Sequence, residues 1–208
     1  MPLTLALECA TAACSAALFD NGELVDSRYE VLGRGHAERL VPMIAELPGR
    51  GRADRILVSL GPGSFTGVRI GLAAARALGL AWRAEVLGYP TLALVAAMAR
   101  AERPGRPVSV CAAGGHGEWF VQNFGPDTEP DDELVSLPPA EAAARCRHAL
   151  IAGSQAHAAA ELLGDDREAL GLLPDARRAG LLSGRELGSS LAPIYGRPPD
   201  AKLPGETR

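Results

Sequence analysis

The glycine-rich segment at residues 61–67, GPGSFTG, is the part of this sequence best suited to bind a ligand. It joins a short apolar run at residues 56–60 to a helix-like stretch, so we expect it to turn a buried strand into a helix N-terminus. Free backbone N–H groups at such a turn hold anions. No lysine is within reach as in a P-loop, and Pro62 stands where a nucleophile elbow needs glycine. Two interpretations stay open: a phosphate-binding loop, or a structural turn capped by Ser64 or Thr66.

An acidic residue, Glu8, interrupts the apolar strand at residues 3–9, and a small-residue turn around Thr11 follows it. A carboxylate at a strand end beside such a turn can hold a metal–phosphate pair. A lone acid at this place is more often a solvated strand end, and we expect that arrangement here. The phosphate-type set that the two segments define consists of Glu8, Thr11, Gly61, Gly63, Ser64, Thr66 and Gly67.

The stretch after the glycine-rich loop carries a stripe of small residues, Gly67, Gly71, Ala75 and Gly79, at four-residue intervals. Small residues on one stripe let another backbone approach closely. Each glycine inside a helix costs up to roughly 1 kcal/mol relative to alanine, so tight packing must offset that loss. The residues leave open whether the packing partner is internal or belongs to another chain.

The histidines and cysteines lack the spacings of metal sites and nucleophiles. The histidines form no HxxxH or HExxH pair, so we predict no metal site and nominate no catalytic residue. Widely spaced cysteines predict four small buried side chains rather than a disulfide framework. The acidic run at residues 131–133 is expected to be a solvated loop. The histidines are His36, His116, His148 and His157, and the cysteines are Cys9, Cys14, Cys111 and Cys146.

The chain has 208 residues, a net charge of −4 and 47% apolar residues. This length fits one domain or two small lobes. The net charge argues against a generally basic surface, although residues 28–106 contain twelve arginines and six acids. That half either faces an anionic partner or presents solvated arginines. Neither a membrane span nor a signal peptide is predicted, so we expect a cytoplasmic protein.

The periodicity of apolar residues predicts an antiparallel meander followed by alternating helices and strands. The first unit is predicted to have strands at residues 3–9, 14–19, 24–31, 56–60 and 84–87, and helices at 36–47, 67–82 and 91–100. The second is predicted to have strands at 108–112, 119–124 and 148–152, and helices at 139–146, 154–163 and 183–191. We therefore predict two α/β lobes, at residues 1–103 and 104–192, and an extended tail at 193–208.

Four blocks of the sequence form a recognisable set. They are LALECATAACSAALFDNG at residues 5–22, HAERLVPMI at 36–44, GPGSFTGVRIG at 61–71 and PIYGRPPDAK at 193–202. Together they resemble the opening, the first helix, the signature loop and the ending of the TsaB (YeaZ) family. The resemblance covers most of residues 3–100 and the final fifteen or so, and the loop motif is the most specific part of it.

The resemblance implies a two-lobed α/β fold of the ASKHA type (actin-like, sugar-kinase-like and RNase H-like), with a reduced second lobe. It implies a non-catalytic scaffold that pairs with a TsaD-type catalytic subunit. That subunit transfers threonylcarbamoyl to N6 of the adenosine 3′ of the anticodon in tRNA. It further implies that ATP and metal bind to the partner and not to this chain. A TsaE-type ATPase would join the assembled complex, tRNA would bind through the complex, and the chain alone could form a homodimer.

Some positions depart from the family pattern. Glu8 replaces the usual Asp, and Ala113 and Gly115 stand where the second-lobe hairpin of the family has Asp and Arg. In the tail, Gly196 replaces the usual Leu. The changes at Ala113 and Gly115 argue against nucleotide binding by this chain.

We expect the helices at residues 36–47 and 67–82 to contact the partner. The predicted partner-binding residues are His36, Leu40, Met43, Ile44, Val68, Gly71, Leu72, Ala75 and Gly79. Three alternatives stay open. The first is an ATP-dependent kinase or hydrolase of the same superfold that uses loop 61–67. The second is a metallopeptidase, and the third is direct tRNA binding through the arginine-rich first half.

Overall fold

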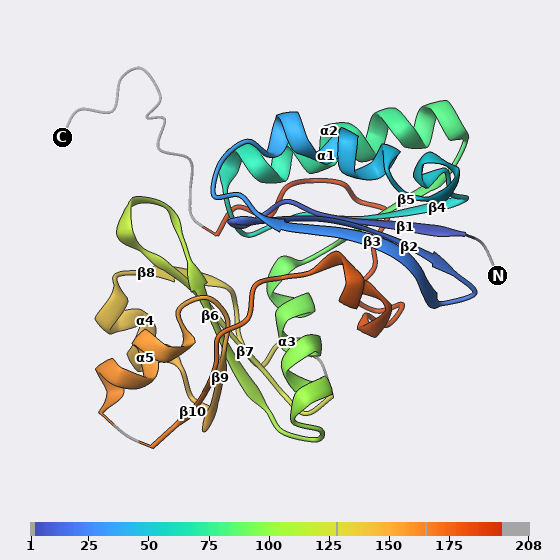
Figure 1. Cartoon of the computed structure of the whole chain (residues 1–208). Helices are drawn as coiled ribbons and strands as arrows, with labels where there is room; N and C mark the ends of the chain where they lie inside the picture. The colour runs from blue at the N-terminus through green and yellow to red at the C-terminus, as the bar shows by residue number, and fades with distance from the viewer. Residues whose placement is uncertain (1–2, 128, 165, 197–208) are drawn as a thin grey trace.

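The computed structural model describes residues 3–127, 129–164 and 166–196. They form two five-stranded sheets that lie one above the other in Figure 1, each with helices packed against it. None of the helices in these ranges is long and apolar enough to cross a membrane.

The first sheet has the strand order β3-β2-β1-β4-β5. Its members are β1 (Thr4–Glu8), β2 (Ala13–Asp20), β3 (Glu23–Val31), β4 (Arg55–Ser59) and β5 (Glu85–Tyr89). The first three strands form the predicted antiparallel meander, and β4 and β5 run parallel to β1. Asn21 and Gly22 both have positive φ, 52° and 85°, as the tight turn between β2 and β3 requires.

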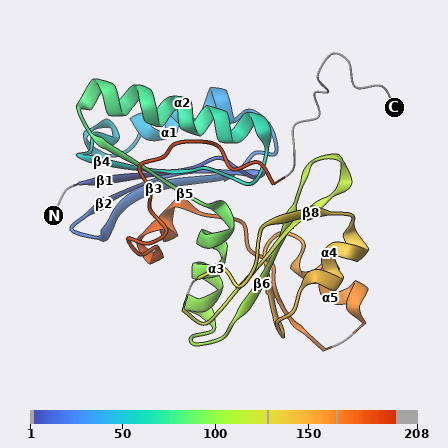
Figure 2. The same cartoon turned by 180° about the vertical axis from the view of Figure 1, so that it is seen from behind.

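One face of this sheet is covered by α1 (His36–Ala45) and α2 (Phe65–Trp82), which lie side by side in Figures 1 and 2. The apolar residues that recur along α1 point to the sheet, so Leu40 and Met43 are fully buried. Helix α2 begins at Ser64, whose Oγ accepts a hydrogen bond from the Gly67 N–H at 3.2 Å. The predicted Ser64 cap is therefore confirmed.

The second sheet has the order β10-β9-β6-β7-β8. Its strands are β6 (Val108–Ala113), β7 (Trp119–Phe124), β8 (Val135–Leu137), β9 (Leu150–Ala152) and β10 (Glu168–Leu170). In both sheets the first strand is central, with an antiparallel pair on one side and two parallel strands on the other. Helices α4 (Pro139–Arg145) and α5 (Ala156–Leu163) lie on its outer face (Figure 1). The sequence pattern does not predict the three-residue strands β8 and β10, which are only half-buried, whereas the equally short β9 is fully buried and is predicted.

Helix α3 (Thr91–Glu102) joins the two lobes. Leu92 and Ala96 belong to the core of the second lobe, whereas Leu94 and Met98 pack with Ala17 and other residues of the first sheet. A helix buried on opposite faces must be apolar all round, which explains the absence of a polar stripe in its sequence.

The chain returns to the first lobe after β10. The Ala176 N–H donates to Ser15 Oγ at 3.0 Å, Gly188 forms a β-bridge with Gly88, and the Ile194 N–H donates to Leu60 O at 2.8 Å. The predicted second lobe, residues 104–192, is therefore too long, because its last part covers the first sheet. The predicted tail begins at 193 within this returning segment, and residues 197–208 lie outside the described residues.

One local prediction is wrong. The helix expected at residues 183–191 is absent, because Gly188 pairs with Gly88 of β5. A short 3₁₀ turn at Ala176–Leu181 precedes it.

The acidic run at residues 131–133 is a loop in which Asp131 and Glu133 are exposed, as predicted. Asp132 differs, because its side chain is only 9% exposed and its carboxylate accepts from the Asn123 N–H at 2.9 Å and the Asn123 Nδ2 at 2.7 Å. Arg147 adds an ion pair with Asp132 at 2.8 Å.

The stripe of small residues on α2 gives a stability prediction. A Cβ atom on Gly67 would lie 2.1 Å from the Cys9 carbonyl oxygen, whereas one on Gly71 would meet only ordinary contacts at 3.6 Å. Gly67→Ala should therefore lower the free energy of unfolding by about 2 kcal/mol or more, as overpacked cores do. Gly71→Ala should leave it unchanged or raise it by up to about 1 kcal/mol through helix propensity. Urea unfolding of both variants checks this, and equal effects would contradict it.

Candidate functional site

The glycine-rich loop packs directly against the turn between β1 and β2. The Ser64 N–H donates to the Ala10 carbonyl oxygen at 2.7 Å. A Cβ atom on Gly63 would lie 2.0 Å from that same oxygen, so only glycine fits there. With the Gly67 N–H taken by the Ser64 side chain, two N–H groups of the predicted phosphate-type loop are used within the chain. The geometry favours the structural turn over the phosphate-binding loop.

A cavity of about 730 Å³ opens between the lobes beside this contact. The first lobe contributes the β1–β2 turn and the start of α2, and the second contributes the β6–β7 hairpin, which rises toward the first lobe in Figure 1. Its lining includes Thr11, Gly63, Ser64, Thr66, His116 and Ser154, and no Asp or Glu is among the described residues that line it. Four members of the predicted phosphate-type set therefore meet at one wall, whereas Glu8, Gly61 and Gly67 lie outside the lining.

Glu8 is fully buried, so the expectation of a solvated strand end is wrong. Its Oε1 accepts from the Ala10 N–H at 2.7 Å, and its Oε2 lies 3.3 Å from the Tyr89 hydroxyl, which also reaches Leu7 O at 3.0 Å. Burial raises the pKa of Glu8 from 4.5 to about 7, and hydrogen bonds from Ala10, Ser59 and Tyr89 lower it in part. Tyr89 ends β5, on the far side of β4, so sequence spacing cannot reveal this contact.

The structure places the predicted partner-binding residues inside the first lobe, although the sequence left open whether they are core or interface. Gly71 lies against Cys9 and Val58, and Gly79 lies against Val86, so the small-residue stripe packs on the chain's own sheet. Those residues are buried in the isolated chain. They are His36, Leu40, Met43, Ile44, Val68, Gly71, Leu72, Ala75 and Gly79.

His36 has a local role that the sequence pattern did not show. Its Nε2 lies 2.9 Å from Thr11 O and 3.3 Å from Ala13 O. The ring thus ties the start of α1 to the β1–β2 turn, which carries Thr11 to the cavity.

The cysteine prediction is confirmed, since all four cysteines are free and buried. Cys9 and Cys14 face each other across the end of the first hairpin, with their Sγ atoms 3.6 Å apart. Among residues 3–127, 129–164 and 166–196, no group of three or more His, Cys, Asp or Glu side chains is placed to hold a metal ion.

Sequence reasoning missed an aromatic cluster beside the cavity. Phe65 at the start of α2 and Tyr195 of the returning segment have ring centroids 5.8 Å apart. The Arg69 guanidinium lies 3.5 Å from the Phe65 ring centroid and donates to the Tyr195 hydroxyl at 3.1 Å. Phe65 and Tyr195 are 130 residues apart in the chain, so only the fold brings them together.

Two α/β lobes with the same strand order and a cavity between them define the ASKHA class, as expected. Two solved structures from Pseudomonas aeruginosa match nearly the whole chain. One is described as an uncharacterized protein with similarity to peptidase YeaZ, with a TM-score of 0.76 and 31% identity, over 95% of this chain and 100% of that one. The other, YeaZ itself, has a TM-score of 0.77 and 28% identity, over 94% and 100%.

Sequence comparisons agree with the structures. Residues 29–151 match the family model of TsaD, tRNA N6-adenosine threonylcarbamoyltransferase. The tRNA threonylcarbamoyladenosine biosynthesis protein TsaB of Escherichia coli is 38% identical over 97 residues, which is 44% of this chain and 42% of that protein. The match thus spans less than half the length of this curated relative. The chain belongs to the TsaB (YeaZ) family, within the wider TsaD-related group.

The buried carboxyl gives a pH prediction. Because Glu8 binds its proton more tightly in the folded chain than in the unfolded one, its contribution to stability is largest below about pH 4.5 and declines until about pH 7. The difference between the two pKa values of Glu8 corresponds to a loss of about 3 kcal/mol in the free energy of unfolding between these pH values. Glu8→Gln should remove this decline. Urea unfolding of the natural chain and of Glu8→Gln between pH 5 and pH 8 checks this prediction. The surface ion pairs are the same in the two proteins, so a difference between their pH curves reports Glu8. Parallel curves would contradict the assignment.

Proposed function

We propose that this chain is a non-catalytic scaffold subunit in the biosynthesis of threonylcarbamoyladenosine in tRNA. Membership of the TsaB (YeaZ) family carries the proposal, since a relative is named for this pathway. In this proposal a TsaD-type partner carries ATP, metal and the transfer of threonylcarbamoyl to N6 of adenosine. A TsaE-type ATPase joins the assembled complex, and tRNA is bound through it.

The geometry of the loop and of Glu8 supports a non-catalytic role. The Glu8 carboxylate beside the β1–β2 turn is enclosed by Ala10 and Tyr89 and is not part of the cavity lining. In loop 61–67, the Ser64 and Gly67 N–H groups donate hydrogen bonds to acceptors within the chain. A kinase or hydrolase of the same superfold is the alternative, and the cavity between the lobes is the feature that favours it.

The outward face of α1 and α2 supports pairing through these helices. Val41 on α1 is 59% exposed and Leu80 on α2 is 84% exposed. Helix α2 also presents Ala73, Ala77 and Ala81, all exposed and four residues apart. Short side chains let a second helix approach closely, and the large apolar residues at the ends supply area to bury. The same face would allow two copies of this chain to pair when no partner is present.

Reconstitution tests the scaffold. Product formation is measured with tRNA, the TsaD-type subunit, the adenylate-forming enzyme and the companion ATPase, with and without this chain. We expect threonylcarbamoyladenosine only when the chain is present, and we expect Glu8→Gln to support it equally. Product that forms without the chain would refute the role. Saturable ATP binding to the chain, abolished by Glu8→Gln, would instead support the kinase or hydrolase alternative.

A surface substitution tests the pairing face. Val41→Asp places a charge in the proposed contact and should weaken binding to the TsaD-type subunit by at least about 10-fold. The matched control is Leu162→Asp on α5, an equally exposed leucine on the outer side of the second lobe. Isothermal titration calorimetry of the three proteins checks this. Equal affinity for all three would exclude the α1/α2 face.

A further inference from the structure

The cluster of Phe65, Arg69 and Tyr195 is an exposed aromatic surface that the scaffold role leaves unexplained. Phe65 is 57% exposed and Tyr195 is 49% exposed, yet both also line the cavity between the lobes. Large exposed aromatic side chains that gather beside an arginine at a cavity are typical of a binding site. Phe65 and Arg69 continue the exposed row of α2 that carries Ala73 and Ala77, at the end of the helix that borders the cavity.

The cluster is held in place by contacts that do not depend on a ligand. The Ile194 N–H donates to Leu60 O at 2.8 Å, which fixes the segment that carries Tyr195. The Ser64 cap fixes the first turn of α2, where Phe65 lies. Arg69 then joins the two rings through its guanidinium. A surface that is already ordered loses little conformational entropy on binding.

The charges around the cluster favour an anionic ligand. Arg69 makes no ion pair with any carboxylate among the described residues. By contrast, Arg28, Arg55 and Arg147 each pair with an Asp or Glu side chain. The cavity wall that the cluster borders has no acidic residue in the described part of the chain. Both features occur in a chain whose net charge is −4.

We propose that this cluster binds an unpaired base of RNA by stacking, with Arg69 supplying the positive charge. Aromatic rings and guanidinium planes are the groups on which unstacked RNA bases lie, and arginine also attracts the phosphate backbone. The inference rests on the proposed function, which makes tRNA the substrate of the complex. It adds a direct RNA contact by this chain, at the end of α2 that borders the cavity.

Fluorescence anisotropy with the full chain tests the contact. One labelled RNA is a hairpin with a seven-nucleotide loop, and the other is a blunt duplex with the same stem. We expect the hairpin to bind at least 10-fold more tightly than the duplex, because only its loop offers unpaired bases. Equal affinities would overturn the proposal, as would no binding of either RNA. Adenosine monophosphate is the competitor, and displacement of the hairpin by equimolar nucleotide would assign the site to a free nucleotide instead.

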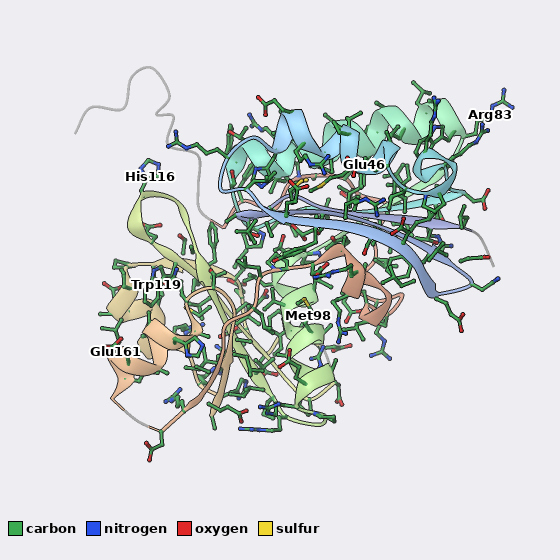
Figure 3. The ribbon with its side chains drawn as sticks, in the orientation of Figure 1. Glu46, Arg83, Met98, His116, Trp119 and Glu161 are labelled. Carbon is green, nitrogen blue, oxygen red and sulfur yellow. The ribbon has the colours of Figure 1, made fainter. Side chains whose placement is uncertain are left out.

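Substitutions separate stacking from charge. Phe65→Ala and Tyr195→Ala should each weaken hairpin binding by about 5-fold to 150-fold, the range for loss of one stacked base. Arg69→Lys keeps the charge but loses the planar group, so it should weaken hairpin binding and leave duplex binding unchanged. The charge-matched control is Arg83→Lys, at the end of α2 far from His116 in Figure 3. Equal losses for Arg69→Lys and Arg83→Lys would overturn stacking.

The two proposals fail separately. If Phe65→Ala loses the hairpin but keeps its affinity for the TsaD-type subunit, the RNA contact stands apart from pairing. If Val41→Asp still pairs while Phe65→Ala loses the hairpin, only the pairing face is wrong. If Phe65→Ala binds the hairpin as the natural chain does, the RNA contact is wrong, whatever the pairing results show.

Discussion

The close contact between the β1–β2 turn and the glycine-rich loop determines the arrangement of the first lobe. The Ala10 carbonyl oxygen accepts from the Ser64 N–H, and Gly63 and Gly67 leave room for the carbonyls of residues 9 and 10. Any side chain at those glycines would push α2 away from the sheet. The contact therefore sets where α2 begins, which face it turns outward and where Phe65 meets the cavity.

The β1–β2 turn also covers the buried carboxyl group of Glu8. Removing a carboxylate from water is unfavourable, and Glu8 is retained with a backbone N–H at one oxygen and the Tyr89 hydroxyl near the other. This arrangement couples the end of β1 to the end of β5. The Glu8 carboxylate contacts the β1–β2 turn through the Ala10 N–H, and the His36 ring of α1 contacts the same turn through the carbonyl oxygen of Thr11. The turn thus has a structural role at a position where an exposed carboxylate would be available for chemistry.

The two lobes have the same sheet topology, but they differ in size. The second sheet has the same strand order as the first, and its strands other than β6 are shorter than their counterparts. Helix α3 and the returning segment connect the two sheets. Because that segment passes Leu60 before it reaches Tyr195, it completes the first lobe and one wall of the cavity together. The surface of the chain then offers an apolar face on α1 and α2 and, at the end of α2 that borders the cavity, an aromatic, cationic cluster.

Most of the local elements and the family can be predicted from the sequence alone. Apolar periodicity, the Asn21-Gly22 turn and the Ser64 cap are local features, so most strands and helices were predicted within a few residues. The family motif predicted the two-lobed class. Only the tertiary structure decided which face of α2 is core, because a stripe of small residues permits close approach to a sheet or to another helix alike. It also decided that Glu8 is buried, that residues 183–191 are not helical and that Phe65 meets Tyr195. Each of these depends on atoms contributed by distant parts of the chain, and spacing along a sequence carries no record of such contacts.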